Sequence, residues 1–301
     1  MSILLEPPPD SIELPTGFVA GGIHCGLKKG GALDLGLLMA ERAVPGAAIY
    51  TQNRLVGAHV AVCRDHLARS GGLVRAVLVN SKNANCATGE QGIADARLCC
   101  RELARRIGCP EEQVLMASTG PIGAPLPVAK ITDNLDMLLS RASAEGGMDF
   151  ARAIMTTDTQ PKARHLERTG VRATGFAKGS GMIHPNMATM LSFMLTDGSL
   201  GDVATAATAL QRIADCSMHR VTVDGDTSPN DTLLALHSGR NAAAEGTTEA
   251  VLTELGRGLA RTIAADGEGA TRLVTVEVRG ARSEGEAAAV GRVIATSPLV
   301  K

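Results

Sequence analysis

The chain alternates between short apolar runs and longer amphipathic stretches, and this pattern predicts both strands and helices. Short runs rich in Val, Leu and Ile are typical of strands, whose side chains alternate between the two faces of a sheet. On this basis the sequence predicts strands at Ala47–Tyr50, Ala58–Cys63, Leu73–Val79, Val114–Ala117, Met190–Leu195, Arg220–Val223, Thr232–Leu236 and Leu273–Val278.

Helices are predicted where apolar residues recur at three- and four-residue spacing. In the first of them Ile93, Ala96, Cys100 and Leu103 follow this period, and Gly108 with Pro110 ends the helix. Strands and helices mix without strict alternation, so the sequence favours an α+β layered sandwich over a doubly wound sheet. The predicted helices are Gln91–Ile107, Val128–Leu139, Phe150–Met155, Asp202–Cys216, Thr248–Ala265 and Ser283–Ile294.

Composition excludes several classes of protein. The chain has 301 residues, 45 % of them hydrophobic, so it can bury a core. Lys and Arg number 30 against 31 Asp and Glu, which argues against a nucleic-acid partner bound through bulk positive charge. With four Phe, one Tyr and no Trp, stacking platforms for bases are not expected. No apolar stretch approaches the roughly 20 residues that span a bilayer, so no membrane partner is predicted.

The seven cysteines indicate reduced thiols rather than a disulfide framework or a metal site. No Cys-x-x-Cys pair is present, and no Cys/His spacing fits zinc. Asp224–Asp226 and Asn230–Asp231 lack the spacing and final Glu of a calcium loop and are interpreted as turn and support residues. From these spacings no metal is expected. The N-terminus lacks the basic region of a secretion signal, so a cytoplasmic protein is expected.

One stretch has an unusual density of glycine, proline and polar residues: Lys178-Gly-Ser-Gly-Met-Ile-His-Pro-Asn-Met-Ala-Thr189. It ends where an apolar strand begins. A threonine hydroxyl is a poor nucleophile unless a base activates it, and an N-terminal threonine carries its own base in the α-amine. That arrangement requires the bond between Ala188 and Thr189 to be cut first. Taken alone, a threonine at this position favours a structural role at the start of a strand, because β-branched residues are typical of strands.

The same stretch resembles the self-cleavage region of the ornithine acetyltransferase / glutamate N-acetyltransferase (ArgJ) family, through its Ala-Thr-Met-Leu sequence at 188–191. Other segments resemble that family collinearly along nearly the whole chain. They are Gly17–Ile23, Asn80–Asn85, Ala117–Gly120, Ala153–Thr159, Thr222–Thr232, Ala265–Ala270 and Ser297–Lys301.

The resemblance implies a fold and a set of roles. It implies an ArgJ/DmpA-like layered αββα sandwich, forming one catalytic domain over 1–301. Self-cleavage would give a 1–188 α chain and a 189–301 β chain, which associate as a hetero-oligomer. Thr189 is then the nucleophile, and Thr119 with Gly120 forms the oxyanion hole. Substrate is bound by Thr156, Lys178, Thr189 and Glu268.

The implied reaction moves an acetyl group from N2-acetylornithine to glutamate in arginine biosynthesis. It proceeds through an acetyl-Thr189 intermediate and needs no cofactor, although some family members also take acetyl from acetyl-CoA. Two alternatives stay open: an aminopeptidase-like hydrolase with an N-terminal nucleophile, and an inactive remnant. The second arises because the family continues beyond the segment that ends this chain at Lys301, so the resemblance describes a C-terminally truncated member.

Overall fold

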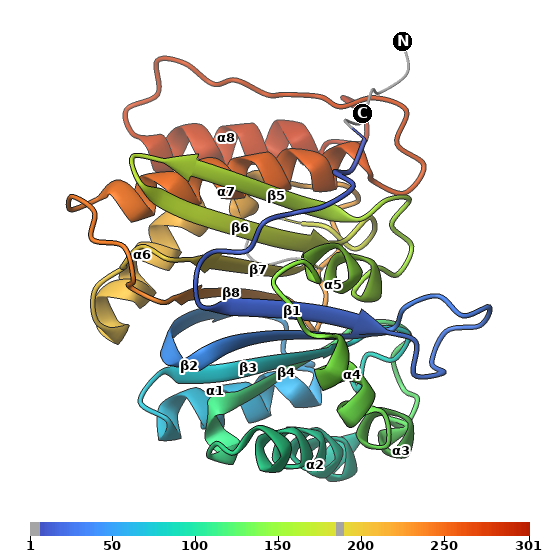
Figure 1. Cartoon of the computed structure of the whole chain (residues 1–301). Coiled ribbons are helices and arrows are strands. Elements are labelled where there is room, and N and C mark those ends of the chain that lie inside the picture. Colours follow the sequence, from blue (N-terminus) through green and yellow to red (C-terminus); the bar gives the residue numbers. More distant parts are fainter. Residues whose placement is uncertain (1–6, 185–189) are drawn as a thin grey trace.

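The computed structural model describes residues 7–184 and 190–301. Within these ranges the strands form one eight-stranded mixed sheet in the order β4-β3-β2-β8-β7-β6-β5, with β1 paired to β2 (Figure 1). The strands are β1 (Phe18–Ile23), β2 (Leu35–Tyr50), β3 (Leu73–Asn80), β4 (Val114–Ser118), β5 (Lys162–Arg168), β6 (Val171–Lys178), β7 (Leu191–Thr196) and β8 (Thr232–His237).

The long strand β2 joins two halves of this sheet. Its first part, Leu35–Met39, pairs with β3 and β1, and its last part, Gly46–Tyr50, pairs with β8. The register shifts between Met39 and Val44. Such an irregularity bends a strand, so one strand serves both halves.

Alternating side chains place three cores on the two faces of the bent sheet. In β7, Phe193 and Leu195 join a central core, whereas Met194 joins an outer one. In β3, Val77 and Val79 join the same central core, whereas Leu78 joins a second outer one. The central core therefore lies between the two half-sheets, and each outer core lies under helices.

The helices complete the layers. The helices α6 (Val203–Asp215) and α7 (Thr247–Ala265) cover one half-sheet, and α1 (Ala58–Arg69) and α2 (Gly89–Ile107) cover the other (Figure 1). The remaining helices are α3 (Val128–Thr132), α4 (Leu135–Arg141), α5 (Gly147–Ala153), α8 (Glu284–Thr296) and two 3₁₀ turns, Glu111–Gln113 and Met218–Arg220. The order helix, half-sheet, half-sheet, helix confirms the expected α+β αββα sandwich.

Phe150 on α5 occupies the middle of the central core. Its ring packs edge-to-face against Phe176 and Phe193, with centroids 5.1 and 5.5 Å apart. Three of the four phenylalanines therefore meet in one cluster, which ties α5 to β6 and β7. The segment that follows α5 carries part of the candidate site, so this packing holds that segment in place.

Three of the predicted strands are wrong. Ala58–Cys63 forms the first half of the helix α1, because a short apolar run has the same appearance in a buried helix and a buried strand. Arg220–Val223 begins in a 3₁₀ turn, and the Val223 N–H bonds only to the Ile183 carbonyl, 2.8 Å away. Leu273–Val278 runs irregularly beside α8, without a ladder partner among the described strands.

Candidate active site

The turn after β4 carries Thr119 and Gly120, the predicted oxyanion-hole pair. The Thr119 N–H donates to the Asn80 carbonyl at 3.0 Å, and the Thr119 carbonyl accepts from the Asn83 N–H at 3.0 Å. Gly120 has φ of +138°, and a Cβ there would lie 2.5 Å from the Asn83 nitrogen. Only glycine fits this position, since its backbone is strained for any other residue and packs against another backbone segment.

Lys178 lies directly against this turn. Its side chain is 3 % exposed, and its Nζ donates a hydrogen bond of 3.2 Å to Thr119 Oγ1. Burial lowers the pKa of Lys178, and the neighbouring Asp158 carboxylate opposes that change. Because Thr119 Oγ1 accepts from the ammonium, its own hydroxyl proton is directed elsewhere and is available to a third group.

Asp158 joins Lys178 to Thr156. One carboxylate oxygen accepts from the Gly179 N–H at 2.7 Å, and the other accepts from the Thr156 N–H at 2.9 Å. Burial alone would raise the pKa of Asp158, but the charges of Lys178 and Lys162 and the Gly179 N–H bring it down to about 2. The carboxylate is therefore ionised at neutral pH and fixes two of the predicted substrate-binding residues relative to each other.

A buried ion cluster extends this contact. The Lys162 Nζ lies 2.5 Å from one oxygen of Asp158 and 2.5 Å from one oxygen of Asp266. Asp266 also accepts from the backbone N–H and the hydroxyl of Thr159. A buried ammonium between two carboxylates is tolerated only when all three are paired, so these segments must assemble together.

Glu268 follows two residues after Asp266, in the turn that ends α7. Its N–H donates to the Ser180 carbonyl at 2.7 Å. Its carboxylate lies over Gly181, where a Cβ would be 2.8 Å from the carboxyl carbon. The exposed Glu268 is thus placed beside the Lys178–Gly181 segment, with its charge open to solvent.

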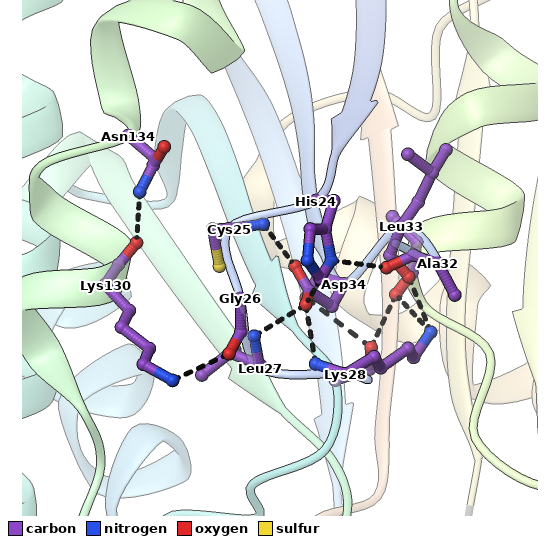
Figure 2. A network of polar contacts seen from close by, with 12 residues as sticks. His24, Cys25, Gly26, Leu27, Lys28, Ala32, Leu33, Asp34, Lys130 and Asn134 are labelled. Carbon is purple, nitrogen blue, oxygen red and sulfur yellow. Dashed lines mark hydrogen bonds and ion pairs between the residues drawn. The ribbon is translucent and has the colours of Figure 1, made fainter. Parts of the chain in front are cut away.

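A tight loop between β1 and β2 borders the same region and carries another lysine (Figure 2). Buried Asp34 accepts the backbone N–H groups of Cys25, Leu27 and Lys28, each at 2.7 Å. The Lys28 ammonium donates to the Leu33 carbonyl at 2.6 Å and reaches the Ala153 carbonyl at 3.5 Å. Burial lowers the pKa of Lys28, while Asp34 and Asp158 oppose that change. The loop therefore packs against the segment that leads to Thr156.

Ala188 and Thr189, the predicted cleavage pair and nucleophile, lie outside the described residues. The next residue, Met190, is described and buried. Its N–H donates to Asp231 Oδ1 at 2.8 Å, and its carbonyl accepts from the Thr232 N–H at 3.0 Å. The chain is thus fixed immediately after the predicted nucleophile.

The fold therefore brings Thr119, Thr156, Lys178 and Glu268 into one region, beside the turn that contains Gly120. Lys178 binds Thr119 directly, whereas Thr156 and Glu268 are held through backbone hydrogen bonds to Asp158 and Ser180, and Asp158 also binds the Gly179 N–H. Sequence reasoning missed Asp158, Lys162 and Asp266, which hold this region together. Asp158 and Asp266 lie inside two segments singled out for their resemblance, Ala153–Thr159 and Ala265–Ala270. Their burial carries no local signal, because it depends on strands and helices distant in sequence.

Within residues 7–184 and 190–301, no group of three or more His, Cys, Asp and Glu side chains could hold a metal ion. No described helix is long and apolar enough to cross a membrane. All seven cysteines are free thiols. A cavity of about 430 Å³ lies between α7, Leu273–Val278 and α8, and none of the predicted site residues lines it.

The sequence of this chain is similar to that of a known protein family and its members. The ArgJ family model matches residues 19–301. An "Arginine biosynthesis bifunctional protein ArgJ" from Caldanaerobacter subterraneus is 43 % identical, covering 96 % of this chain and 74 % of the relative. The protein of the same name from Thermus thermophilus is 46 % identical, covering 97 % of this chain and 75 % of the relative.

Solved structures agree with the sequence relatives. The crystal structure of the arginine biosynthesis bifunctional protein ArgJ from Bacillus halodurans is 34 % identical, with a TM-score of 0.50, and covers 60 % of this chain and 98 % of that one. Ornithine acetyltransferase from Mycobacterium tuberculosis, solved in complex with ornithine, is 30 % identical with a TM-score of 0.50. It covers 57 % of this chain and 93 % of that one.

Proposed function

This chain belongs to the ArgJ family, and we propose that it is an acetyltransferase of arginine biosynthesis that carries the acetyl group on Thr189. The observation that carries the proposal is the contact between Lys178 and Thr119, which are 59 residues apart in sequence. This contact joins a turn suited to binding an oxyanion to residues suited to binding an amino acid. Acyl transfer needs both in one place.

The first step of the proposal is self-cleavage. The Thr189 hydroxyl attacks the carbonyl carbon of Ala188, the C–N bond between the two residues breaks, and the hydroxyl proton passes to the released amine. Water then hydrolyses the resulting ester, which leaves a carboxylate on Ala188 and a free hydroxyl on Thr189. The products are a 1–188 chain and a 189–301 chain that stay together as a hetero-oligomer. The new α-amine has a pKa near 8 and acts as the base of the next step.

The second step is acetyl transfer. The Thr189 oxygen attacks the acetyl carbonyl of N2-acetylornithine, and its proton passes through the α-amine to the departing amine of ornithine. The negative charge that develops on the carbonyl oxygen is stabilised by the Thr119 hydroxyl and the Gly120 N–H. Each such donor typically contributes about 3 to 4 kcal/mol to the transition state. The amine of glutamate then attacks the acetyl-Thr189 ester, and Thr189 is restored.

The charged residues of this region suit an amino-acid substrate. We assign the Lys178 ammonium to the substrate carboxylate and the exposed Glu268 carboxylate to a substrate ammonium, because opposite charges favour binding. Thr156 supplies a hydroxyl beside them. The ornithine held by the Mycobacterium tuberculosis structure supports this class of substrate.

The word "bifunctional" in the names of the relatives supports acetyl-CoA as a second acetyl donor. No cofactor enters the proposed reaction, and the cytoplasm is its proposed location. An aminopeptidase-like hydrolase is the weaker alternative, because the relatives above 40 % identity are named for arginine biosynthesis.

Mass spectrometry of the purified chain incubated with N2-acetylornithine tests the proposal. We expect two fragments divided between Ala188 and Thr189, and one acetyl group on the smaller fragment. Thr189→Ala is expected to remain uncut and unacetylated, whereas Thr189→Ser keeps a hydroxyl and is expected to retain part of both activities. Acetyl transfer by uncut Thr189→Ala protein would disprove the role of Thr189. An uncut, unacetylated wild-type chain would instead support the inactive remnant.

A further inference from the structure

The dipeptide Asn230–Asp231 contacts both sides of the candidate site and has no role in the reaction described above. Asn230 is 5 % exposed, and its Nδ2 donates to the Ser118 carbonyl at 2.7 Å and to the Ala84 carbonyl at 2.6 Å. Asp231 is fully buried, and its Oδ1 accepts from the Met190 N–H at 2.8 Å. One side chain thus holds the oxyanion turn, and the next holds the start of β7.

The backbone around this dipeptide is fixed independently of these contacts. The Asp231 carbonyl accepts from the Thr51 N–H at 3.0 Å, and the Ser228 carbonyl accepts from the Thr51 hydroxyl at 2.5 Å. The Asn230 N–H donates to the Ser228 hydroxyl at 3.1 Å. Gly57 lies under the Asn230 side chain, where a Cβ would collide with Asn230 Oδ1. The dipeptide is therefore a rigid support rather than a passive loop.

Covalent geometry connects these contacts to the chemistry. Asp231 holds the nitrogen of Met190, the residue that directly follows the proposed nucleophile in the sequence. The Ser118 carbonyl belongs to the peptide unit that supplies the Thr119 nitrogen. We propose that Asn230 and Asp231 are positioning residues that hold Met190, at the start of β7, in place relative to the Thr119–Gly120 turn. This inference rests on the proposed function of the chain.

To act as a positioning residue, Asp231 needs only a carbonyl-type oxygen that accepts the Met190 N–H. Burial raises the pKa of Asp231, and the Met190 N–H and Lys178 oppose that change. A neutral carboxylic acid and a carboxamide both present such an oxygen and have nearly the same shape. Asp231→Asn therefore keeps the contact, whereas Asp231→Ala removes it.

The experiment compares full-length variants in their rate of self-cleavage and in the kcat and KM of acetyl transfer from N2-acetylornithine to glutamate. Displacing a reacting group by about 1 Å costs roughly 100-fold in rate. We expect Asp231→Ala and Asn230→Ala to slow cleavage and lower kcat by about that factor, with KM changed by less than about threefold. Asp231→Asn is expected to stay within about tenfold of the wild type in both rates.

A second variant displaces the Asn230 side chain without removing it. Gly57→Ala adds a methyl group under Asn230, at a residue whose φ of −61° suits alanine. We expect the same loss of kcat with KM retained. The matched control is Asp197→Ala, at the other end of β7. Asp197 is also fully buried, and it accepts the backbone N–H of Arg172 at 2.8 Å and the side-chain N–H of Asn241 at 2.6 Å. It should lower the melting temperature but leave kcat unchanged.

The outcomes separate this inference from the proposed function. Equal losses in Asp231→Asn and Asp231→Ala would show that Asp231 acts through its proton, which contradicts a positioning role. Wild-type rates in Asp231→Ala and Gly57→Ala, with Thr189→Ala inactive, would overturn the inference and leave the proposed function standing. A wild-type chain that neither cleaves nor transfers acetyl would overturn both.

Discussion

The Lys178 ammonium donates a hydrogen bond of 3.2 Å to the Thr119 hydroxyl oxygen, across a buried boundary between the end of β6 and the turn after β4. A positive charge on one side of a hydroxyl makes that hydroxyl a stronger donor on the other, because hydrogen bonds in a chain polarise one another. Lys178 and Thr119 are therefore expected to act as one unit.

We predict that removing both members of this unit costs little more than removing one. Thr119→Val and Lys178→Met should each lower kcat by about 100- to 1000-fold, the usual effect of losing an oxyanion donor. The double variant should fall by a similar factor rather than by the product of the two. Steady-state kinetics of the four proteins checks this, and multiplicative losses would show that the two residues act independently.

Lys162→Met should destabilise the protein strongly. The change leaves Asp158 and Asp266 buried without their shared cation, and breaking a buried ion pair in this way typically costs about 3 to 5 kcal/mol. Urea unfolding measures the loss. As a comparison, Arg212→Met removes an exposed partner of Glu249 and should cost less than about 1 kcal/mol. Similar costs for the two variants would argue against the buried cluster as a structural support.

Gly181→Ala should weaken substrate binding without affecting the chemical step. The added methyl group would lie 2.8 Å from the Glu268 carboxyl carbon and would displace that flexible side chain. We expect KM for N2-acetylornithine to rise about tenfold, which corresponds to about 1.4 kcal/mol, with kcat nearly unchanged. Gly285→Ala on α8 serves as the control, because its added methyl group would meet only Ser283 Oγ at an ordinary contact distance of 4.0 Å. An unchanged KM in Gly181→Ala would remove Glu268 from the substrate site.

Stability should fall as the pH drops from about 6.5 towards 4. Burial lowers the pKa of His59 and of His237 from 6.5 to about 4 in each case. Between these pH values the unfolded chain binds protons that the folded chain excludes, so acid favours unfolding. Each histidine accounts for up to about 3 kcal/mol by pH 4.

Urea unfolding at several pH values checks this dependence. The free energy of unfolding should change little between pH 8 and 7, where neither histidine titrates, and should decrease below pH 6.5. His237→Gln should reduce the decrease by up to half. A pH-independent free energy between 6.5 and 4 would mean that both side chains reach solvent in the folded protein.

The local pattern of apolar and polar residues was sufficient to predict many of the strands and helices. The apolar runs at Leu73–Val79 and Thr232–Leu236 form β3 and β8, and the amphipathic stretches at Gln91–Ile107 and Thr248–Ala265 form α2 and α7. These elements are predictable because the spacing of apolar residues reports which face of an element is buried. The roles predicted for Thr119, Thr156, Lys178 and Glu268 come from the resemblance of their segments to the ArgJ family, and they stay predictions.

The spacing of apolar residues does not report which other elements cover the buried face. The long-range contacts of an element could therefore not be predicted from the sequence. Ala58–Cys63 forms a helix, and Leu273–Val278 pairs with none of the strands in the described part of the chain, because both outcomes depend on neighbours distant in sequence. The burial of Lys162 between Asp158 and Asp266, 104 residues from its second partner, depends on the folded chain as well. A charge can be buried only where its counter-charges meet, and long-range packing brings those together.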